Sequence, residues 1–577
     1  MISIKRMICL LLITVIVAGM AACSGGETQQ STTANATTAA ATTAAAATEA
    51  AATDAGTSTA AATTQAAAQT TKQQTAAAGN GSGYEKVTIT YATVQAREGY
   101  DYNNGDPFAA WWSEKFNYEL DIAALGWDNW ATQLRVWIST NDMPDVAVYD
   151  YNHADAASFV EQRLLYRYPD DWKQRWPNTA SVYEKTTLGP VIEDLFDGTY
   201  FVPRARFDTN LPGDPLPNHY SLYIRSDWAE AVGVPIKTTY SITEIMELAS
   251  LIKANDPGNV GANLIPMSLT PGNAAHMFLQ MNSTHYNAFY KDTDGEYKWG
   301  AAAPDTLAGL KLWYEAYSTG LLDPEFFVLN SGEDRDKFEV ATITGIHFDQ
   351  LPTMEVAARR ENFTNMTGLN ADELVHYATL LGVDGNYHQR DLINFWGTIV
   401  FGPRVSNDVF ERWMDVMDYA STEEGYAMTV MGLWDVDFAR GADGEYVSLL
   451  AEGETLAGDP GVGKYPSMGY ILGSVKLWDD FAFENPNVDK KYRDESWTLY
   501  TDRGKYSTPE TFTKVDWDLY TFDSPNRRRV NFNYPDEFTN IVTTATSESN
   551  LEELWQTWID AQSSIIQPVL DELNALN

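Results

Sequence analysis

Residues 24–83 cannot contribute to a folded core, and this limits the folded part of the chain to the residues after them. The segment consists mainly of Ala, Thr, Gln, Ser and Gly, and it contains no Leu, Ile, Val, Met or aromatic residue. Such a composition buries too little apolar surface to offset the entropy lost on ordering, so we expect disorder. As a flexible coil it would hold its ends roughly 40 Å apart on average. The sequence therefore predicts a linker over 23–83 and a folded region over 84–577.

The first 22 residues have the features of an export signal. Lys5 and Arg6 form a positive region, and an apolar run over 7–17 comes next. The run is short for a membrane span, which needs roughly 20 apolar residues. Met20-Ala-Ala-Cys23 resembles a bacterial lipobox, and this resemblance implies cleavage before Cys23 and a lipid on its thiol. The alternative is an ordinary secretory cleavage beside an incidental cysteine.

Composition narrows the range of partners. Cys9 and Cys23 are the only two cysteines, and Cys9 would leave with the signal, so the exported domain is predicted to have no disulfide and no cysteine metal site. The formal charge is −40, or −42 after loss of Lys5 and Arg6. Such a chain repels nucleic acid and anionic membrane surfaces. All 18 tryptophans come after residue 83, and we expect most to pack in the core and a few to stack on a ligand.

The pattern of apolar residues predicts an α/β protein. Ser241 and Glu244 have the spacing of a capping box, and Pro568 is expected to kink the last helix. Strands that alternate with helices favour layered α/β packing, and nearly 500 residues favour two lobes. The expected strands are 87–94, 145–149 and 220–225, and the expected helices are 108–116, 241–254, 305–318, 407–420 and 551–576.

Four stretches resemble, in order, segments of one known family. They are Ser139-Thr-Asn-Asp-Met-Pro-Asp-Val146, Phe196-Asp-Gly-Thr-Tyr-Phe-Val-Pro203, Leu222-Tyr-Ile-Arg-Ser-Asp-Trp228 continued by Ala231-Val-Gly-Val-Pro235, and Gly320-Leu-Leu-Asp-Pro-Glu-Phe326. The chain resembles the extracellular solute-binding proteins of bacterial ABC importers. Within that family it looks most like the lipoprotein group that includes alginate-oligosaccharide binders and many sugar binders of Gram-positive bacteria.

The resemblance implies a two-lobed, periplasmic-binding-protein-like fold with a hinge and an interlobe cleft. The chain is expected to cross between lobes near 205–225 and 340–350. The implied function is capture of an oligosaccharide and its delivery to the permease subunits of an ABC importer, with no enzyme activity. The implied location is the outer face of the cytoplasmic membrane, held by the lipid on Cys23 at a Gram-positive cell surface, and the implied state is a monomer.

Many members of this family carry a calcium loop, and here the pattern departs. The corresponding stretch, 256–266, is one residue shorter and offers one carboxylate, whereas calcium takes six to eight oxygen ligands. The stretches 291–295 and 441–444 contain Asp-Gly pairs and are predicted to be hairpin turns. We therefore predict no metal and no cofactor.

The candidate ligand-binding residues come after predicted strands or match binding loops of the family. Sugar rings pack on Trp or Tyr faces, and their hydroxyls pair with Asp, Asn and Arg. Trp396 is the strongest stacking candidate, because relatives present an aromatic platform there. The alternatives are a helix cap at Asp150 to Asn152, surface ion pairs for both arginines, and core packing for Trp434. The candidates are Asp150, Tyr151, Asn152, Arg204, Arg206, Asn394, Trp396 and Trp434.

The remaining aromatic and basic clusters are predicted to be structural. Trp111 and Trp112 are adjacent on one helix, so at most one faces the cleft. Trp127 and Trp130 flank a loop and rank lower, and 555–558 is read as the packed face of the last helix. The run 527–529 is read as a solvated arginine cluster.

Three other functions remain open from the residues alone. A secreted glycoside hydrolase would need two carboxylates at a fixed separation, and 79 acidic residues leave such a pair open. A surface adhesin would bind polymer or host protein without closing, and a peptide is the main rival ligand for a receptor. A phosphate loop ending in Gly-Lys-Ser/Thr is missing from the sequence, so ATP hydrolysis by this chain is not expected.

Overall fold

The computed structural model describes most of the region after residue 84. The described residues belong to one compact unit, 78–577, and the predicted signal peptide, Cys23, the linker and Asn394 lie outside them. Among the described residues, no helix is both long and apolar enough to cross a membrane. The described ranges are 85–94, 99–127, 129–206, 220–351, 355–390, 395–451, 453–456, 463–470, 475–476 and 483–576.

The first lobe is built on a five-stranded sheet of order β2-β1-β3-β13-β4. Its strands are β1 (Val87–Thr93), β2 (Tyr118–Ala124), β3 (Val146–Tyr149), β4 (Val202–Ala205) and β13 (Phe395–Phe401). β1 is parallel to β2 and β3, whereas β13 is antiparallel to both of its neighbours. Every residue of β3 is buried, as expected for a mainly parallel sheet that is covered by helices on both faces.

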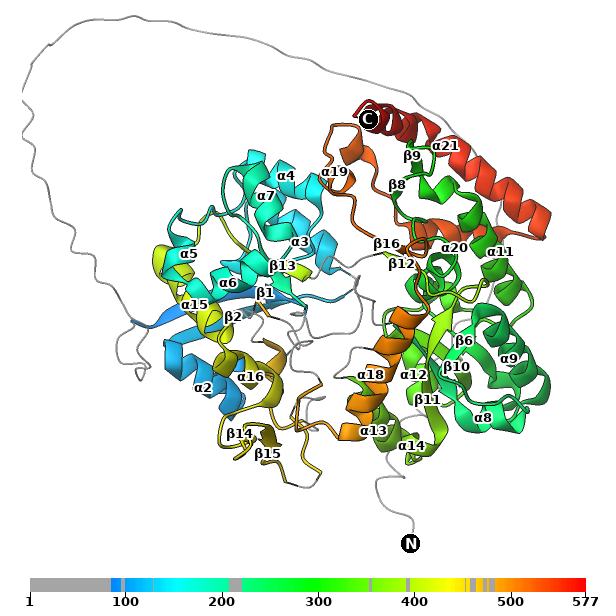
Figure 1. The fold of residues 1–577 in the computed structure, drawn as a ribbon, viewed down its shortest axis with the longest axis horizontal. Helices are drawn as coiled ribbons and strands as arrows, with labels where there is room; N and C mark the ends of the chain where they lie inside the picture. The colour runs from blue at the N-terminus through cyan, green and yellow to red at the C-terminus, as the bar shows by residue number, and fades with distance from the viewer. Residues whose placement is uncertain are drawn as a thin grey trace, which may run out of the picture. The chain divides into compact units, whose positions relative to one another are not determined.

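Helices cover this sheet and complete the first core (Figure 1). Trp413 of α15 packs on Tyr91 of β1, with ring centroids 4.9 Å apart. The predicted helices 108–116 and 407–420 are confirmed as α2 and α15. The helices of this lobe are α2 (Pro107–Phe116), α3 (Trp130–Ser139), α4 (His153–Glu161), α5 (Trp172–Arg175), α6 (Pro177–Lys185), α7 (Leu188–Phe196), α15 (Asn407–Ala420) and α16 (Glu423–Met431).

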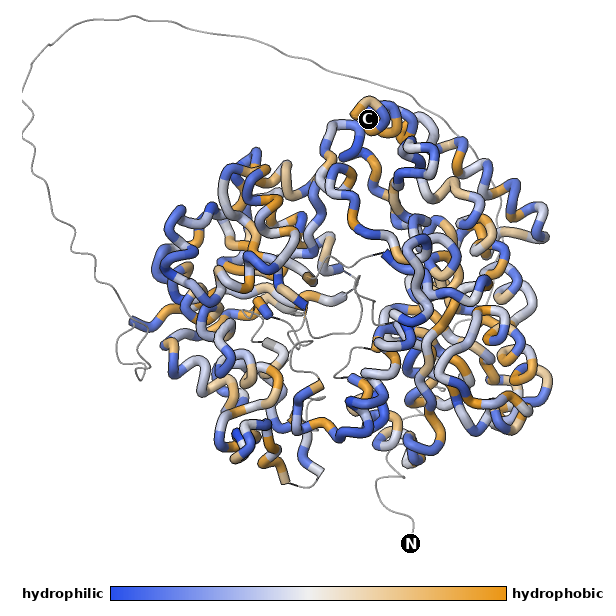
Figure 2. The backbone as a smooth tube through the Cα atoms, viewed as in Figure 1, coloured by the Kyte–Doolittle hydropathy of each residue, from blue (hydrophilic) through white to orange (hydrophobic). Residues whose placement is uncertain are grey.

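The second lobe has a sheet of order β6-β11-β5-β10-β7. β11 is parallel to β6 and β10 is parallel to β7, whereas β5 between them is antiparallel to both neighbours. The core of this lobe is separate from the first, and Figure 2 shows apolar segments within each lobe. Its strands are β5 (Tyr220–Arg225), β6 (Thr239–Ser241), β7 (Ile265–Ser268), β10 (Thr344–Gln350) and β11 (Val375–Leu381).

The helices of the second lobe come from two separate stretches of the chain. The first stretch supplies α8 (Ser226–Ala231), α9 (Ile242–Asn255), α10 (Pro271–Ala274), the π-helical turn η3 (Ala275–Gln280), α11 (Pro304–Ser318), α12 (Glu333–Glu339), α13 (Glu355–Thr367) and α14 (Ala371–Leu374). The second supplies α18 (Lys490–Lys505), α19 (Trp517–Tyr520), η7 (Arg527–Arg529), α20 (Tyr534–Thr544) and α21 (Glu548–Asn574).

Short elements complete both lobes. The Asp-Gly turns predicted at 291–295 and 441–444 are confirmed, because each joins an antiparallel pair and its Gly has a positive φ. The pairs are β8 (Phe289–Lys291) with β9 (Tyr297–Trp299), β14 (Phe438–Arg440) with β15 (Tyr446–Ser448), and β12 (Gln389–Arg390) with β16 (Phe512–Thr513). Single 3-10 turns are η1 (Tyr102–Asn104), η2 (Gly261–Asn263), η4 (Gly300–Ala302), η5 (Phe326–Val328) and η6 (Met468–Tyr470).

A local sequence signal placed the start of α9 correctly, and the last helix was also expected from the sequence. Ser241 Oγ accepts from Glu244 N, and Glu244 accepts in return from the Ser241 backbone N–H, so the predicted capping box opens α9. α21 is one element that runs through Pro568. Trp555 is buried and donates to Ala301 O, which confirms the predicted packed face of this helix.

The direction of the crossing strands depends on where the chain enters each sheet. The chain leaves the first sheet at the end of β4 and enters the second at β5; it returns between β11 and β13. A strand entered from the neighbouring lobe begins at the edge where its parallel neighbours end, so it must run antiparallel to them. Both β5 and β13 do so. The crossing predicted near 340–350 was wrong, because those residues form β10 within the second sheet.

Candidate ligand-binding cavity

A cavity of about 1680 Å³ lies where the strand ends of both sheets face each other. From the first lobe it is lined by residues that come after β2 and β3, by the end of β4 and the residue after it, and by the start of β13. From the second lobe it is lined by the start of β5, the end of β10 and the turn after β7. Ligands of open α/β sheets bind outside the carboxyl ends of parallel strands. Each lobe thus presents the edge of its sheet at which binding loops gather.

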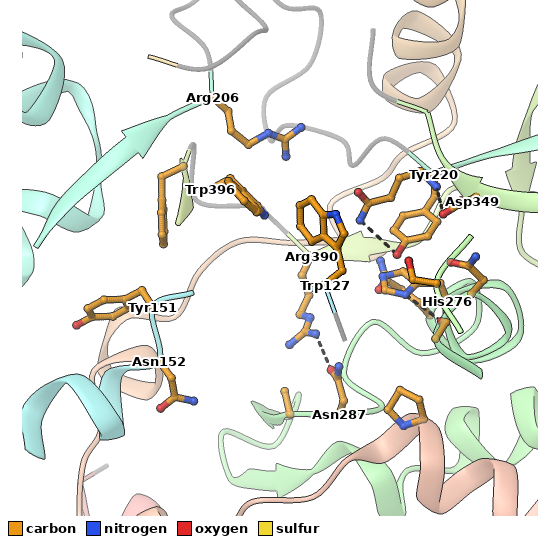
Figure 3. Close-up of a pocket in the computed structure, with 18 of the residues that line it drawn as sticks. Trp127, Tyr151, Asn152, Arg206, Tyr220, His276, Asn287, Asp349, Arg390 and Trp396 are labelled. Carbon is orange, nitrogen blue, oxygen red and sulfur yellow. Dashed lines mark hydrogen bonds between the residues drawn. The ribbon is translucent and has the colours of Figure 1, made fainter. Parts of the chain in front are cut away.

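Three tryptophans form an aromatic cluster at the first-lobe wall, and two of them, Trp127 and Trp396, are seen in Figure 3. Trp130 is buried and anchored by a 2.8 Å bond from its Nε1 to Val148 O. Trp396 packs on it at 5.2 Å between centroids, and Trp127 lies 5.9 Å from Trp396. The side chain of Trp127 is 55% exposed. This exposed ring, backed by two packed ones, is a platform of the kind that accepts the apolar face of a sugar.

Trp396 is held in place by an irregularity in its strand. The pairing of β13 with β4 shifts register between Phe395 and Thr398, and Gly397 has φ 65°. A Cβ at Gly397 would lie 2.9 Å from Val148 Cγ1, so the close approach and the positive φ both favour glycine. Such bulges often re-aim a side chain beside a site. The guanidinium of Arg204 lies over the Trp396 ring at 5.3 Å, and burial lowers the Arg204 pKa to about 10.

Five of the candidate residues line the cavity, namely Tyr151, Asn152, Arg204, Arg206 and Trp396. Asn152 also caps α4 through a 3.3 Å bond from Asp155 N, so the structural alternative for this residue holds beside its place in the wall. Whether these residues contact a ligand stays a prediction.

Two candidates, Asp150 and Trp434, do not line this cavity. Asp150 points to Arg135, which donates to both of its carboxylate oxygens at 3.1 Å, and it does not line the cavity. Trp434 packs on Phe438 at 4.3 Å, within the β14–β15 hairpin region, and its Nε1 donates to Glu424 O. The predicted strand end before Asp150 is correct. Adjacent residues on an extended segment point in opposite directions, so Tyr151 lines the cavity and Asp150 does not.

The second-lobe wall pairs histidines with tyrosines. Tyr220 at the start of β5 stacks on His276 at 4.0 Å between centroids, and His285 stacks on Tyr290 at 4.5 Å. Burial lowers the pKa of His276 to about 4 and that of His285 to about 4, and the nearby Arg390 acts in the same direction. Both rings are therefore neutral at neutral pH and present flat surfaces with hydrogen-bonding nitrogens.

Basic residues outnumber acidic ones among the described residues that line the cavity, nine against four. Asp349 is paired with Arg335 at 3.1 Å, and Glu355 is paired with Arg359. Asp516 accepts from Tyr297 Oη and Leu519 N, and Asp536 accepts from Asn533 Nδ2. The basic residues are Arg204, Arg206, Lys291, Arg335, Arg359, Arg390, Lys476, Lys514 and Arg527.

Part of this wall was not predicted from the sequence. Trp127 was ranked low because it flanks a predicted loop, yet it supplies the exposed ring. Arg527 was read as solvated, yet it lines the cavity and lies over the Phe289 ring at 5.5 Å. His276, His285 and Arg390 gave no local signal, since stacking and burial arise only from segments brought together by the fold.

The carboxylate expected at the degenerate calcium loop has structural partners. Asp256 Oδ1 and Oδ2 accept from Val260 N and Gly261 N, each at 2.8 Å. Within the described ranges, we find no cluster of three or more His, Cys, Asp or Glu side chains able to hold a metal.

The fold has counterparts among solved structures. An alginate-binding protein solved without calcium ion aligns with a TM-score of 0.60 at 15% identity, covering 85% of this chain and 97% of that one. A Streptococcus pneumoniae ABC-transporter substrate-binding protein in complex with kestose aligns at 0.55 with 16% identity, covering 85% and 100%. An extracellular solute-binding protein from Bifidobacterium longum subsp. infantis aligns at 0.54 with 15% identity, covering 85% and 97%. This is the two-lobed solute-binding-protein fold.

Neither family models nor curated proteins give a match to this chain. The solute-binding-protein fold confirms the two-lobed α/β architecture expected from the sequence.

Proposed function

We propose that this protein is the lipid-anchored substrate-binding component of an ABC importer. It captures an oligosaccharide in the cavity between its lobes and delivers it to a membrane permease. The observation that carries this proposal is the cavity itself, whose volume of about 1680 Å³ exceeds the roughly 300–1,000 Å³ of ordinary small-molecule pockets. A ligand of several rings suits such a space.

The lining chemistry supports a sugar over a peptide. The Trp127 ring is exposed beside Trp396, and flat stacked surfaces recur on the other wall at Tyr220 and Tyr290. Arginine forks and Asn152 and Asn287 surround them, which suits paired hydroxyl groups. The solved relatives named above include one in complex with kestose.

A glycoside hydrolase is less well supported by the same cavity. Its general acid needs a raised pKa. Burial raises the pKa of Asp349, but His347 and Arg335 outweigh that effect and hold it below its ordinary value. Glu355 is held by Arg359.

Binding is tested by thermal unfolding of the purified exported protein against neutral oligosaccharides, acidic oligosaccharides and peptides. A ligand held only by the folded state raises the melting temperature, by an amount set by its concentration relative to Kd. We expect a shift with an oligosaccharide, a smaller scattering radius on binding, and recovery of the ligand unchanged. A shift with peptides alone, or a cleaved sugar, would overturn the proposal.

The anchor is tested separately by cell fractionation. Cys23→Ser is expected to move the protein from the membrane fraction to the medium, whereas Cys9→Ser, within the predicted signal, leaves it in the membrane. Retention of the Cys23 variant in the membrane would contradict the lipid anchor.

A further inference from the structure

The charge of the cavity opposes that of the chain. The whole chain carries −40, yet the described cavity residues include nine basic and four acidic side chains. Arg335 and Arg359 are neutralised by Asp349 and Glu355. Because the chain is rich in carboxylates, most basic side chains in the cavity could form an ion pair. A basic side chain that makes no such pair is therefore informative about the ligand.

Arg390 is the first such residue. It ends β12, and its Nη2 donates to Asn287 Oδ1 at 2.5 Å (Figure 3). Asn287 is a neutral amide, and among the described residues no carboxylate lies within ion-pair distance of Arg390. Burial lowers the pKa of Arg390, because the charged guanidinium loses contact with water and gains no counter-ion.

Arg527 is the second basic cavity residue without a carboxylate partner. The two arginines that follow it in the sequence have different surroundings. Arg528 pairs with Asp523 at 2.5 Å, and Arg529 is exposed and lies outside the cavity lining. Arg527 alone of this run lines the cavity, with its guanidinium over the Phe289 ring. Within the described ranges Arg527, too, makes no ion pair with a carboxylate. Burial lowers its pKa, although the more distant Asp523 and Asp155 act to raise it.

The two guanidinium groups belong to one part of the wall. Arg390 contacts Asn287 and Arg527 covers Phe289, two residues further along the same segment. Both also act on Tyr534: burial raises the pKa of its hydroxyl, and Arg527 and Arg390 each oppose that rise. Two partly buried cations therefore face the cavity together, beside the flat rings of His285 and Tyr290.

Burying a charge without a partner is costly, and two like charges in one wall add to the cost. An anion bound in the cavity would offset this cost, and arginine forks bind carboxylates and tetrahedral oxyanions in bidentate geometry. We propose that Arg390 and Arg527 form a subsite for the acidic group, carboxylate or sulfate, of an anionic oligosaccharide. This inference rests on the proposed function and narrows its ligand class.

The test measures binding of short linear oligouronates, their sulfated neutral-backbone counterparts and their carboxyl-reduced forms to the full exported protein by calorimetry. We expect one of the two acidic series to bind at least about 10-fold more tightly than the reduced form, since hydrogen bonds to charged groups contribute that much or more. The series that binds identifies carboxylate or sulfate as the recognised group. Arg390→Gln and Arg527→Gln should each abolish that preference, and Arg529→Gln, the matched control, should keep it.

A second readout separates the subsite from a structural role. Because each substitution removes a partly buried cation that makes no ion pair with a carboxylate, Arg390→Gln and Arg527→Gln should unfold at the same or a higher temperature than the parent. Affinity for the reduced, neutral sugar should change less than about twofold. A lower melting temperature together with loss of all binding would overturn the assignment of a ligand role.

The outcomes also separate this inference from the proposed function. If neutral oligosaccharides bind and acidic ones bind no better, the subsite is overturned and the sugar receptor stands. If acidic sugars bind equally to the parent and both Gln variants, the assignment to these two arginines is overturned. If no oligosaccharide binds, the proposed function fails and the inference fails with it.

Discussion

Tyr151 and Tyr520 stack with their ring centroids 6.3 Å apart and their planes only 9° apart. Tyr151 comes after β3 in the first lobe, whereas Tyr520 ends α19, which reaches the cavity from the C-terminal part of the chain. On the same short helix, Trp517 and Tyr520 pack against the first core and Leu519 packs against the second. α19 thus links the two cores beside the cavity.

A double-mutant cycle on Tyr151→Ala and Tyr520→Ala tests this link. Stacked aromatic pairs contribute about 0.5–1.5 kcal/mol beyond the area they bury. We expect a coupling of that size in the free energy of unfolding, measured by denaturant titration. Additive effects of the two substitutions would show that the rings do not stabilise each other.

The tryptophan platform should control affinity for a bound sugar. Trp127→Ala removes a 55% exposed ring, so we expect affinity to fall by about 10-fold or more with the melting temperature nearly unchanged. Trp434→Ala is the matched control, since that ring packs outside the cavity, and it should leave affinity unchanged. Calorimetry with any oligosaccharide that binds the parent decides, and equal affinities for both variants would exclude Trp127 from the site.

Acid should destabilise the second lobe through its neutral histidines. Burial holds the pKa of His276 and His285 at about 4, below the roughly 6.5 of an unfolded histidine. The unfolded state therefore binds more protons between pH 6.5 and 4, and stability falls as pH decreases through that window, by up to about 1.4 kcal/mol per pH unit for each ring. The charged groups that act on His276 are Arg390 and Asp349.

Replacing both rings should flatten this dependence. The variant His276→Asn/His285→Asn is expected to lose less stability than the parent between pH 6.5 and 4, as measured by denaturant unfolding at a series of pH values. A slope equal to that of the parent would contradict the assignment of depressed pKa values to these two residues.

The capping box of α9 offers a test that is independent of ligand. Ser241→Ala removes the acceptor for Glu244 N, and loss of such a cap costs about 1 kcal/mol of stability. Ser563→Ala, at an exposed position inside α21, is the control and should change stability by less than about 0.5 kcal/mol. Chemical unfolding measures both, and equal values would show that the cap does not stabilise the helix.

Much of the local structure could be predicted because its causes lie close together in the sequence. The Ser241–Glu244 spacing, the Asp-Gly pairs before Gly295 and Gly444, and the β-branched alternation of 87–93 each act within a few residues. The order of the family-like stretches also predicted the two lobes. The second crossing between the lobes was predicted at the wrong place. The sequence of β10 does not reveal whether the strand pairs within the second sheet or the chain leaves for the first lobe, because that depends on its pairing partners.

The candidate site shows the same division. The predicted strand end at Tyr149 placed Tyr151 and Asn152, whereas Arg204, Arg206 and Trp396 came from the resemblance to the family. Only the tertiary structure decided that Trp127 presents an open ring while Trp434 packs on its own hairpin, and that Arg527 turns inward while Arg529 stays in solvent. Exposure, burial and ion pairing depend on which distant segments meet, and for that reason no local pattern in the sequence encodes them.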